Sequence, residues 1–345
     1  KELVAAAKES GADAVKFQIV YADEILHPDT GFVNLPTGRI PLYERFRELE
    51  CSIDFYAELA QYAHKCGMLF SASAFGLRSA DELRQLNPAF IKIASPELNH
   101  FPLLEHVASF GRPVILSSGV SMLGDIERAI RCLETCGLPA DMRALLHCVT
   151  AYPAPETDYN TAVLQSLSAL FNSPVGISDH SLDPAAVPIA GLLCGACIIE
   201  KHICLSRNDA GLDDPVALEP TQFLLMSSIV RNLTGKSNED IFNAAETYGY
   251  SKDFLRHIIG GGEKKLAAAE KENYGKTNRS LHYVKDLPKG AVLKDNDVAV
   301  LRTEKNLTVG ESPEYLHYFV GAVLQKEVKG GAGAVFNDII ERKIP

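Results

Sequence analysis

The sequence predicts an α/β protein built as a (β/α)8 barrel, the TIM barrel, which lacks its first strand in this chain and is followed by a small β-rich module. Over the first 235 residues, seven short and continuously apolar runs alternate with amphipathic segments, a pattern typical of parallel strands buried on both faces. The chain begins within a helical pattern, which implies one further strand upstream, and eight strands close such a barrel. No Gly-x-Gly-x-x-Gly pattern follows an early run, which disfavours the alternative, an open doubly wound sheet.

The individual elements follow from the hydrophobic pattern. The apolar runs predict strands at 14–18, 68–71, 90–93, 114–117, 144–148, 175–177 and 197–200. The amphipathic segments predict helices that include 53–66, 80–86, 103–110 and 123–136, and a glycine follows the first and the last of these as a stop signal. Residues 31–41 carry Gly and Pro at both ends and are predicted to form a long loop.

The composition and hydrophobic pattern of the sequence change twice and so divide the chain into three parts. Residues 1–235 form the predicted barrel, which would be the catalytic domain. Residues 236–275 are polar and are predicted to be a helical linker, with residues 264–271 rich in Ala, Glu and Lys. Residues 276–345 contain short apolar runs separated by Gly- and Pro-containing turns, which predicts a β-rich module.

Charge and composition exclude several functional classes. The 345 residues carry 34 basic and 44 acidic side chains, a net charge of −10, which disfavours nucleic acid as the main partner. No apolar run approaches about 18 residues, so no membrane span is expected. Among eight cysteines, Cys194 and Cys197 form a C-x-x-C pair, for which we favour buried free thiols over a metal or redox site. Free thiols and the lack of a signal-peptide pattern predict a cytoplasmic protein.

Polar side chains gather where the predicted strands end, which is where a barrel places its active site. Lys16 and Lys92 lie at two of these ends, and a lysine in a barrel mouth is costly unless an anion pairs with it. Serines follow the strands as well, at positions 71, 73, 95, 117, 118 and 178. Two ammonium groups and several hydroxyls predict a pocket that binds phosphate and carboxylate groups. The alternative is that the two lysine side chains extend to solvent.

A second group of strand-end residues predicts a metal site. His180 and His202 each follow one of two neighbouring strands, so their imidazoles can converge on one point. Imidazole ligands suit Mn, Fe, Co, Ni or Zn better than Ca, and two histidines leave coordination positions for water and substrate. Glu97 and Asp213, in the loops after Lys92 and His202, are acid–base candidates, with solvated loop carboxylates as the alternative.

Six motifs in this order resemble the N-acetylneuraminate (sialic acid) synthase family. They are Gly11-Ala-Asp-Ala-Val-Lys-Phe-Gln18, Ile91-Lys-Ile-Ala-Ser-Pro-Glu97, Val114-Ile-Leu-Ser-Ser-Gly119, Leu145-Leu-His-Cys148 with Tyr152-Pro-Ala-Pro155, Val175-Gly-Ile-Ser-Asp-His180 and Ile199-Glu-Lys-His202. The tail, from Arg279-Ser-Leu281 through Lys289-Gly290 to Arg302, resembles the antifreeze-like (SAF) domain that follows the barrel in that family. The resemblance covers nearly the whole chain.

The resemblance implies an activity: condensation of phosphoenolpyruvate with an N-acetylated amino-sugar aldehyde to give a nine-carbon 2-keto acid and phosphate. It implies that phosphoenolpyruvate is held by Lys16, Ser73, Lys92, Ser95, Ser117 and Ser178. It implies that His180 and His202 bind a divalent metal, usually Mn²⁺, with Mg²⁺ or Co²⁺ as options. The sugar side is assigned to Gln18, Tyr152 and Arg302, and members of the family are domain-swapped homodimers in which the tail arginine enters the partner's barrel.

Departures from the family pattern leave the sugar open. Thr150 stands where relatives often carry Asn or Ser, Asp214 where many carry His, and Thr-Glu-Lys follows Arg302 in place of Pro-Gly. The resemblance therefore implies either N-acetylmannosamine or a diacetamido sugar as the acceptor. The alternatives are another phosphoenolpyruvate-dependent 3-deoxy-ulosonate synthase and a non-catalytic carbohydrate-binding relative.

Overall fold

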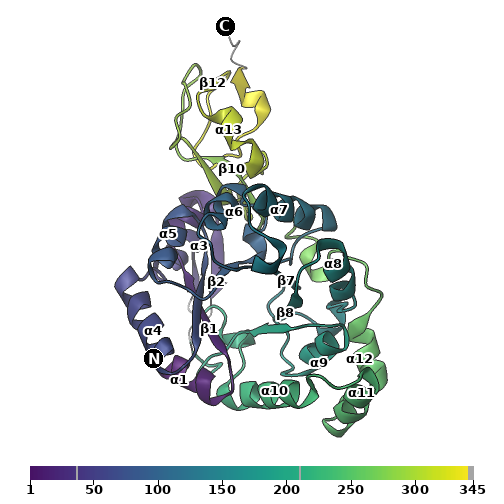
Figure 1. The fold of residues 1–345 in the computed structure, drawn as a ribbon. Helices are drawn as coiled ribbons and strands as arrows, with labels where there is room; N and C mark the ends of the chain where they lie inside the picture. The colour runs from purple at the N-terminus through teal and green to yellow at the C-terminus, as the bar shows by residue number, and fades with distance from the viewer. Residues whose placement is uncertain (36–37, 210, 341–345) are drawn as a thin grey trace.

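The computed structural model describes residues 1–35, 38–209 and 211–340, and its centre is a curled parallel sheet of seven strands inside a ring of helices (Figure 1). The sheet order is β1-β4-β5-β6-β7-β8-β9. The bounds are β1 (Ala14–Ile19), β4 (Leu69–Ala74), β5 (Ile91–Ile93), β6 (Val114–Ser117), β7 (Arg143–Cys148), β8 (Val175–Asp179) and β9 (Ile198–Lys201). Each strand overlaps one of the seven predicted apolar runs, and the predicted fold class is confirmed.

The strand register sets which polar side chains are neighbours. Gln18 pairs with Ser73 across β1 and β4, and Ser73 pairs in turn with Lys92 of β5. At the other end of the sheet, Ser178 of β8 pairs with Glu200 of β9. Because all seven strands run in parallel, their carboxyl ends meet on one side of the sheet, as the barrel prediction requires.

Helices connect successive strands and cover the outside of the sheet (Figure 1). Helix α7 shows why these segments are helical: Ile126, Ala129, Ile130 and Leu133 recur at helical spacing and are all buried. The α-helices of this part are α1 (Glu2–Glu9), α2 (Ala22–Ile25), α3 (Leu42–Arg47), α4 (Ile53–Lys65), α5 (Leu77–Gln85), α6 (Phe101–Ala108), α7 (Leu123–Thr135), α8 (Val163–Phe171), α9 (Ala186–Leu193) and α10 (Pro220–Leu233).

Short 3-10 turns interrupt the loops between these elements. They are η1 (Pro28–Thr30), η2 (Ser95–Glu97), η3 (Ala140–Met142), η4 (Glu156–Asp158), η5 (Asp214–Val216), η6 (Ala268–Glu270), η7 (Pro313–Tyr315) and η8 (Phe336–Asp338). Two of them matter for the site, because η2 follows β5 directly and carries Glu97, and η6 ends on Glu270.

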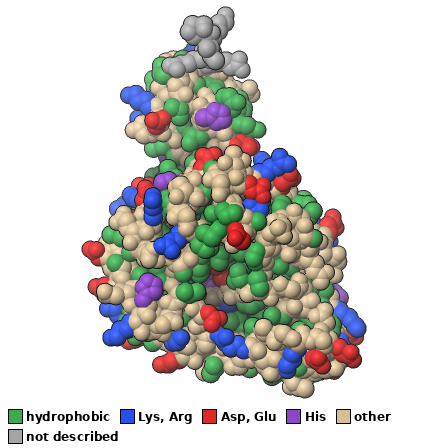
Figure 2. Space-filling model, in the orientation of Figure 1, with side chains coloured by type: hydrophobic (Ala, Val, Ile, Leu, Met, Phe, Trp, Pro, Cys, Tyr) green, Lys and Arg blue, Asp and Glu red, His purple; other side chains and the backbone are tan. Residues whose placement is uncertain are grey.

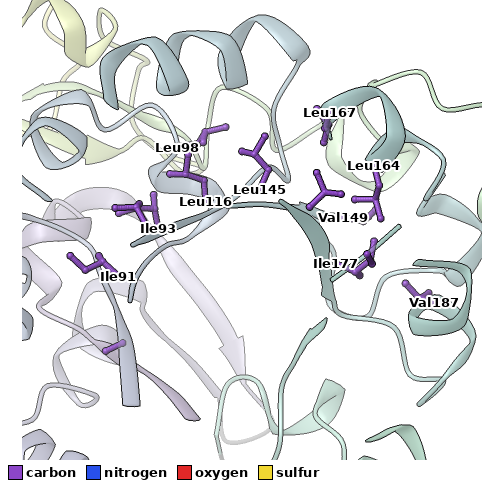
Figure 3. Close-up of a cluster of buried hydrophobic side chains, with 14 of the residues drawn as sticks. Ile91, Ile93, Leu98, Leu116, Leu145, Val149, Leu164, Leu167, Ile177 and Val187 are labelled. Carbon is purple, nitrogen blue, oxygen red and sulfur yellow. The ribbon is translucent and has the colours of Figure 1, made fainter. Parts of the chain in front are cut away.

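The main hydrophobic core lies between the sheet and the helices. Figure 3 shows side chains of β5, β6, β7 and β8 facing those of α8 and α9 in this layer, with Ile93, Leu145, Ile177, Leu164 and Val187 among them. All five are fully buried. Burial of this apolar area is the main favourable contribution to folding, and it fixes the strand ends that carry the polar residues.

The segment after β1 differs from its prediction. Instead of a long loop at 31–41, the structure contains an antiparallel hairpin of β2 (Phe32–Leu35) and β3 (Gly38–Pro41), in which Val33 pairs with Ile40. The Gly and Pro residues mark the ends of two short strands rather than an irregular loop. Pro41 is tolerated because it is the last residue of an edge strand. Residues 36–37 of the predicted loop lie outside the described residues.

The predicted linker contains two helices, α11 (Asn238–Thr247) and α12 (Lys252–Ile259), and both pack against α9 of the barrel. The helical prediction is wrong for residues 264–271, where η6 is the sole regular element. Gly260, at φ +65°, ends α12, and Gly262 follows it at φ +80°, a backbone conformation that favours glycine and breaks a helix. Glu270 is buried there, so side-chain contacts decide the path of the chain.

The tail is β-rich, as predicted, and has a hydrophobic core of its own that includes Leu281, Tyr283, Phe319 and Leu324. Strands β10 (Arg279–Tyr283) and β11 (Val298–Arg302) pair antiparallel, as do β12 (Val323–Leu324) and β13 (Ile339–Ile340), and α13 (Leu316–Phe319) lies between them in sequence. Figure 1 shows this module beside the rim of the barrel near α6. Residues 341–345 of the predicted module lie outside the described residues.

The surface shows no single charged patch on the face drawn in Figure 2, where acidic and basic side chains are scattered around the rim. In the described parts of the chain, every helix is too short or too polar to cross a membrane.

Candidate active site

Strand-end residues from both edges of the sheet meet around one carboxylate. Lys92 Nζ lies 3.6 Å from Glu200 Oε1, and Lys16 Nζ lies 3.8 Å from Glu200 Oε2. Ser178 Oγ donates a hydrogen bond of 2.8 Å to Glu200 Oε1, and Lys92 Nζ donates one of 2.7 Å to Ser117 Oγ. The structure therefore brings together four of the predicted phosphoenolpyruvate ligands, with Glu200 between the two lysines.

The electrostatics of this group follow from burial and from the two lysines. Lys92 is 2% exposed, and burial lowers its pKa although Glu200 opposes the shift. Burial raises the pKa of Glu200, but Lys16 and Lys92 outweigh burial and bring the value down to about 2. Glu200 is therefore ionised at neutral pH. Lys16, Ser178, Glu200 and His202 help to line a cavity of about 750 Å³.

The other two predicted phosphoenolpyruvate ligands lie on the neighbouring strand ends. Ser73 is buried on β4 and is paired in register with Lys92. Ser95 is buried after β5, and its Oγ accepts a hydrogen bond of 2.9 Å from the Gly119 amide. These serines occupy the strands between Lys16 and Ser117, so the six predicted residues come from five strands of one sheet and from the loop after β5.

The predicted histidine pair is close together. The rings of His180 and His202 have centroids 5.4 Å apart, and Tyr152 stacks on His180 at 4.3 Å. Asp213 Oδ2 lies 3.7 Å from His202 Nδ1 and accepts a hydrogen bond of 3.3 Å from Gln18 Nε2. The structure thus gathers the predicted metal ligands, two of the predicted sugar-side residues and one acid–base candidate at the same end of the sheet.

The two imidazoles have different surroundings. His180 Nδ1 is 2.9 Å from the Val149 carbonyl oxygen and 3.8 Å from Cys148 Sγ. Burial is the largest single effect and disfavours the protonated ring, but Cys148, the Val149 carbonyl and Asp179 together outweigh it and raise the pKa of His180 to about 9. Burial lowers the pKa of His202 to about 4; Asp213 opposes this shift, and His180 adds to it.

The donor set fits a divalent cation of the imidazole-preferring type. The Val149 carbonyl occupies Nδ1 of His180, which leaves Nε2 as the free nitrogen of that ring. The neighbouring ring of His202 adds a second imidazole, the ligand type that suits Mn or Zn. The described residues contain no group of three or more His, Cys, Asp or Glu side chains already placed to hold an ion, so water and substrate would complete the coordination.

Glu97 has a different environment from the one that its sequence position suggests. It is fully buried, and its Oε1 accepts hydrogen bonds from Arg279 Nη2 at 3.0 Å and from Arg302 Nη2 at 2.6 Å. Both arginines belong to the tail module of the same chain. Arg302, predicted to contact the sugar, therefore contacts Glu97 in this structure. Glu97 Oε2 is buried and has no hydrogen-bond partner among the described residues.

Sequence reasoning missed several of these residues. Glu200 carries a sequence signal that could have identified it, because it is a charged residue at the end of an apolar strand next to His202. Arg279 opens the tail motif, but its pairing with Glu97 links positions 182 residues apart and leaves no local pattern. Cys197 was predicted to be a buried thiol, but it is exposed just before β9. All eight cysteines are free.

Two family models match most of this chain. The NeuB family model matches residues 3–240, and the SAF domain model matches residues 278–340. The chain is 33% identical to the uncharacterized protein MJ1065 of Methanocaldococcus jannaschii, over 89% of this chain and 81% of that protein. It is 32% identical to the N,N'-diacetyllegionaminic acid synthase of Legionella pneumophila, over 98% of this chain and 89% of the relative.

A solved structure has the same fold. The spore coat polysaccharide biosynthesis protein SpsE of Bacillus subtilis superposes with a TM-score of 0.80 at 29% identity, over 99% of this chain and 90% of that one. The resemblance drawn from the six motifs and the tail is thereby confirmed. The chain belongs to the NeuB family, is an enzyme of the synthase type, and carries a SAF domain after its barrel.

Proposed function

We propose that this enzyme condenses phosphoenolpyruvate with an N-acetylated amino-sugar aldehyde, either N-acetylmannosamine or a diacetamido relative, to give a nine-carbon 2-keto sugar acid and phosphate. The observation that carries the proposal is that Lys16 and Lys92 share the Glu200 carboxylate at the same end of the sheet as the paired rings of His180 and His202. Lys16 and His202 line one cavity there. Phosphoenolpyruvate has a phosphate and a carboxylate, and two ammonium groups with nearby hydroxyls match these two anionic groups.

The residues divide into two halves of the pocket. Phosphoenolpyruvate would be held by Lys16, Ser73, Lys92, Ser95, Ser117 and Ser178. The sugar would lie on the side of Gln18 and Tyr152, where Tyr152 already stacks on His180. Arg302 belongs to this half if it exchanges its contact with Glu97 for the sugar. Holding the two substrates in register supplies much of the rate enhancement of such a reaction.

His180 and His202 would hold a divalent metal, for which Mn²⁺ is our first choice and Mg²⁺ or Co²⁺ the others. A metal at this position supplies Lewis-acid polarisation of an aldehyde oxygen. In the reaction, C3 of phosphoenolpyruvate forms a bond to the aldehyde carbon, water adds at C2, and the C–O bond to the phosphoryl group breaks to release phosphate.

The two acidic residues would manage protons in these steps. Glu97 Oε2 is buried without a hydrogen-bond partner among the described residues, so it is available to bind the attacking water. The two arginines on Oε1 hold that carboxylate in place. Asp213, between Gln18 and His202, lies where it can orient the sugar or take a proton from it.

We also propose a cytoplasmic homodimer with exchanged tails. Eight free cysteines suit a reducing compartment. In this structure the tail binds its own barrel through Arg279, Arg302 and Glu97, and an exchange between two copies would reproduce the same contacts with Glu97 of the partner subunit.

The proposal is tested by phosphate release from phosphoenolpyruvate, with the full-length protein, Mn²⁺ and a panel of N-acetylated amino sugars. We expect release with at least one aldehyde sugar, loss of release after chelation, and recovery when Mn²⁺ is restored, because polarisation of the aldehyde requires the cation. Release with a sugar phosphate alone would favour the other ulosonate synthase. No release with any sugar would favour a carbohydrate-binding protein.

A further inference from the structure

The segment that joins the barrel to the tail module crosses the ends of four neighbouring strands. We call residues 270–279 the strap. Glu270 contacts the backbone after β6 and after β7, and Asn278 contacts the backbone after β6. Arg279 contacts the Phe75 carbonyl after β4 and the Glu97 side chain after β5. In sheet order these are β4, β5, β6 and β7, the strands that carry or precede Ser73, Ser95, Ser117 and Thr150.

Glu270 is the centre of the strap. Its side chain is buried, and the residue is 1% exposed. Oε1 accepts hydrogen bonds from the Val120 amide at 2.7 Å and from the Thr150 amide at 2.8 Å, and Oε2 accepts one from the Ala267 amide at 3.0 Å. One carboxylate therefore links two loops of the barrel mouth, and hydrogen bonds to a charged acceptor are stronger than those between neutral groups.

The loop that Glu270 holds is strained. Val120 has φ +40°, which is rarely adopted by a β-branched residue and costs free energy unless its surroundings impose it. The strap holds both polar groups of Val120, because Glu270 accepts from its amide and Asn278 Nδ2 donates to its carbonyl at 3.1 Å. The preceding amide, Gly119, donates to Ser95 Oγ at 2.9 Å, so this backbone conformation orients a predicted phosphate ligand.

We propose that Glu270 and Asn278 are positioning residues of the phosphoenolpyruvate half of the site, through which the tail module is coupled to phosphoenolpyruvate binding. They fix the loops after β6 and β7 so that Ser95, Ser117 and Thr150 present their hydroxyls together to a phosphate. This inference rests on the proposed function. It adds that the part of the chain beyond the barrel affects phosphoenolpyruvate binding, whereas the sequence resemblance assigns the tail a role in sugar binding.

The test compares Glu270→Ala and Glu270→Gln with Glu272→Ala in the full-length protein. Glu272 is exposed two residues further along the same segment and serves as the matched control. Phosphoenolpyruvate binding is measured by calorimetry with Mn²⁺, and the KM values for both substrates by phosphate release. Glu270→Ala is expected to weaken phosphoenolpyruvate binding by about tenfold or more, because it leaves buried amides unpaired, while the KM for sugar stays close to that of wild type.

The conservative variant separates positioning from general support of the fold. The amide oxygen of Glu270→Gln can still accept from Val120 and Thr150, so binding is expected to recover most of the loss. Asn278→Ala removes one hydrogen bond to the same loop, and is expected to shift phosphoenolpyruvate binding in the same direction by less. It keeps the test valid if Glu270→Ala does not fold.

Equal binding in Glu270→Ala and Glu272→Ala would overturn the inference, and so would equal rises of the two KM values. The same experiment separates this inference from the proposed function. If wild type itself does not bind phosphoenolpyruvate, the proposed function falls. If wild type binds it and the strap variants bind it equally well, the strap role alone falls.

Discussion

The Lys92 amine lies in a place that is almost closed to water. Burial lowers the pKa of Lys92, and Glu200 at 3.6 Å opposes that shift. Lys92 Nζ also donates a hydrogen bond to Ser117 Oγ. A buried ammonium group is costly unless paired. Here its partner is the Glu200 carboxylate, which it shares with Lys16.

The first residue-scale prediction concerns this lysine. Lys92→Ala is expected to weaken phosphoenolpyruvate binding by at least about 2 kcal/mol, the scale for losing one partner of a buried charge pair. Calorimetry with the full-length protein measures the change, with Lys65→Ala on α4 as an exposed control. Affinity equal to that of the control would remove Lys92 from the pocket.

The second residue-scale prediction concerns pH. The pKa of Glu200 falls from its ordinary value of 4.5 to about 2 in the folded state. The unfolded chain therefore takes up a proton at higher pH than the folded chain, so the stabilisation from this group is complete above about pH 4.5 and is lost as the pH falls toward 2.

In Glu200→Gln, the free energy of unfolding should therefore decrease less between about pH 4.5 and pH 2 than in wild type. Denaturant titrations of the two proteins across this pH range measure the difference. An acid limb of the same slope in both proteins would contradict the role of Glu200. Neutral-pH stability should also drop, because Lys92 loses its counter-charge.

At the scale of elements, the sequence located the strands well because each is a continuous apolar run that both faces of the sheet bury. Two segments were predicted wrongly for identifiable reasons. In the hairpin β2–β3, Gly and Pro residues lie at the ends of two short strands. The prediction failed because Gly and Pro are equally typical of a loop. In residues 264–271, Ala, Glu and Lys favour a helix by propensity, but the preceding glycines and the contacts of Glu270 decide otherwise.

At the scale of the whole molecule, one buried cluster joins the barrel to the tail. Arg279 is fully buried and donates to Glu97 and to the carbonyl oxygens of Glu24 and Phe75. Arg302 donates to the same oxygen of Glu97. Asn99 adds two hydrogen bonds to the backbone of Arg279, so barrel and module are held together by specific polar contacts.

The prediction at this scale compares the two arginines. Arg279→Ala is expected to lower the free energy of unfolding by about 3–5 kcal/mol, because it removes a partner of a fully buried carboxylate. Arg302→Ala should cost less, because its side chain is 13% exposed and Arg279 remains on Glu97. Denaturant titration measures both.

Arg131→Ala, at an exposed arginine on α7, is the control and should change stability by less than about 0.5 kcal/mol. No loss in either arginine variant would show that the cluster does not hold the module in place, and equal losses would contradict the predicted ranking of Arg279 above Arg302.

The sequence by itself determined the strand and helix alternation, the β-rich tail and the residues at the strand ends, because hydrophobic periodicity and strand-end polarity are local properties of the chain. Lys16, Lys92, His180 and His202 could be named in this way. The tertiary structure alone decided that Glu200 stands between the lysines, that Arg279 and Arg302 share Glu97, and that Glu270 holds a strained valine 150 residues earlier. These pairings join residues far apart in sequence, and only the curling of the sheet and the return of the chain across its strand ends bring their polar groups within reach of one another.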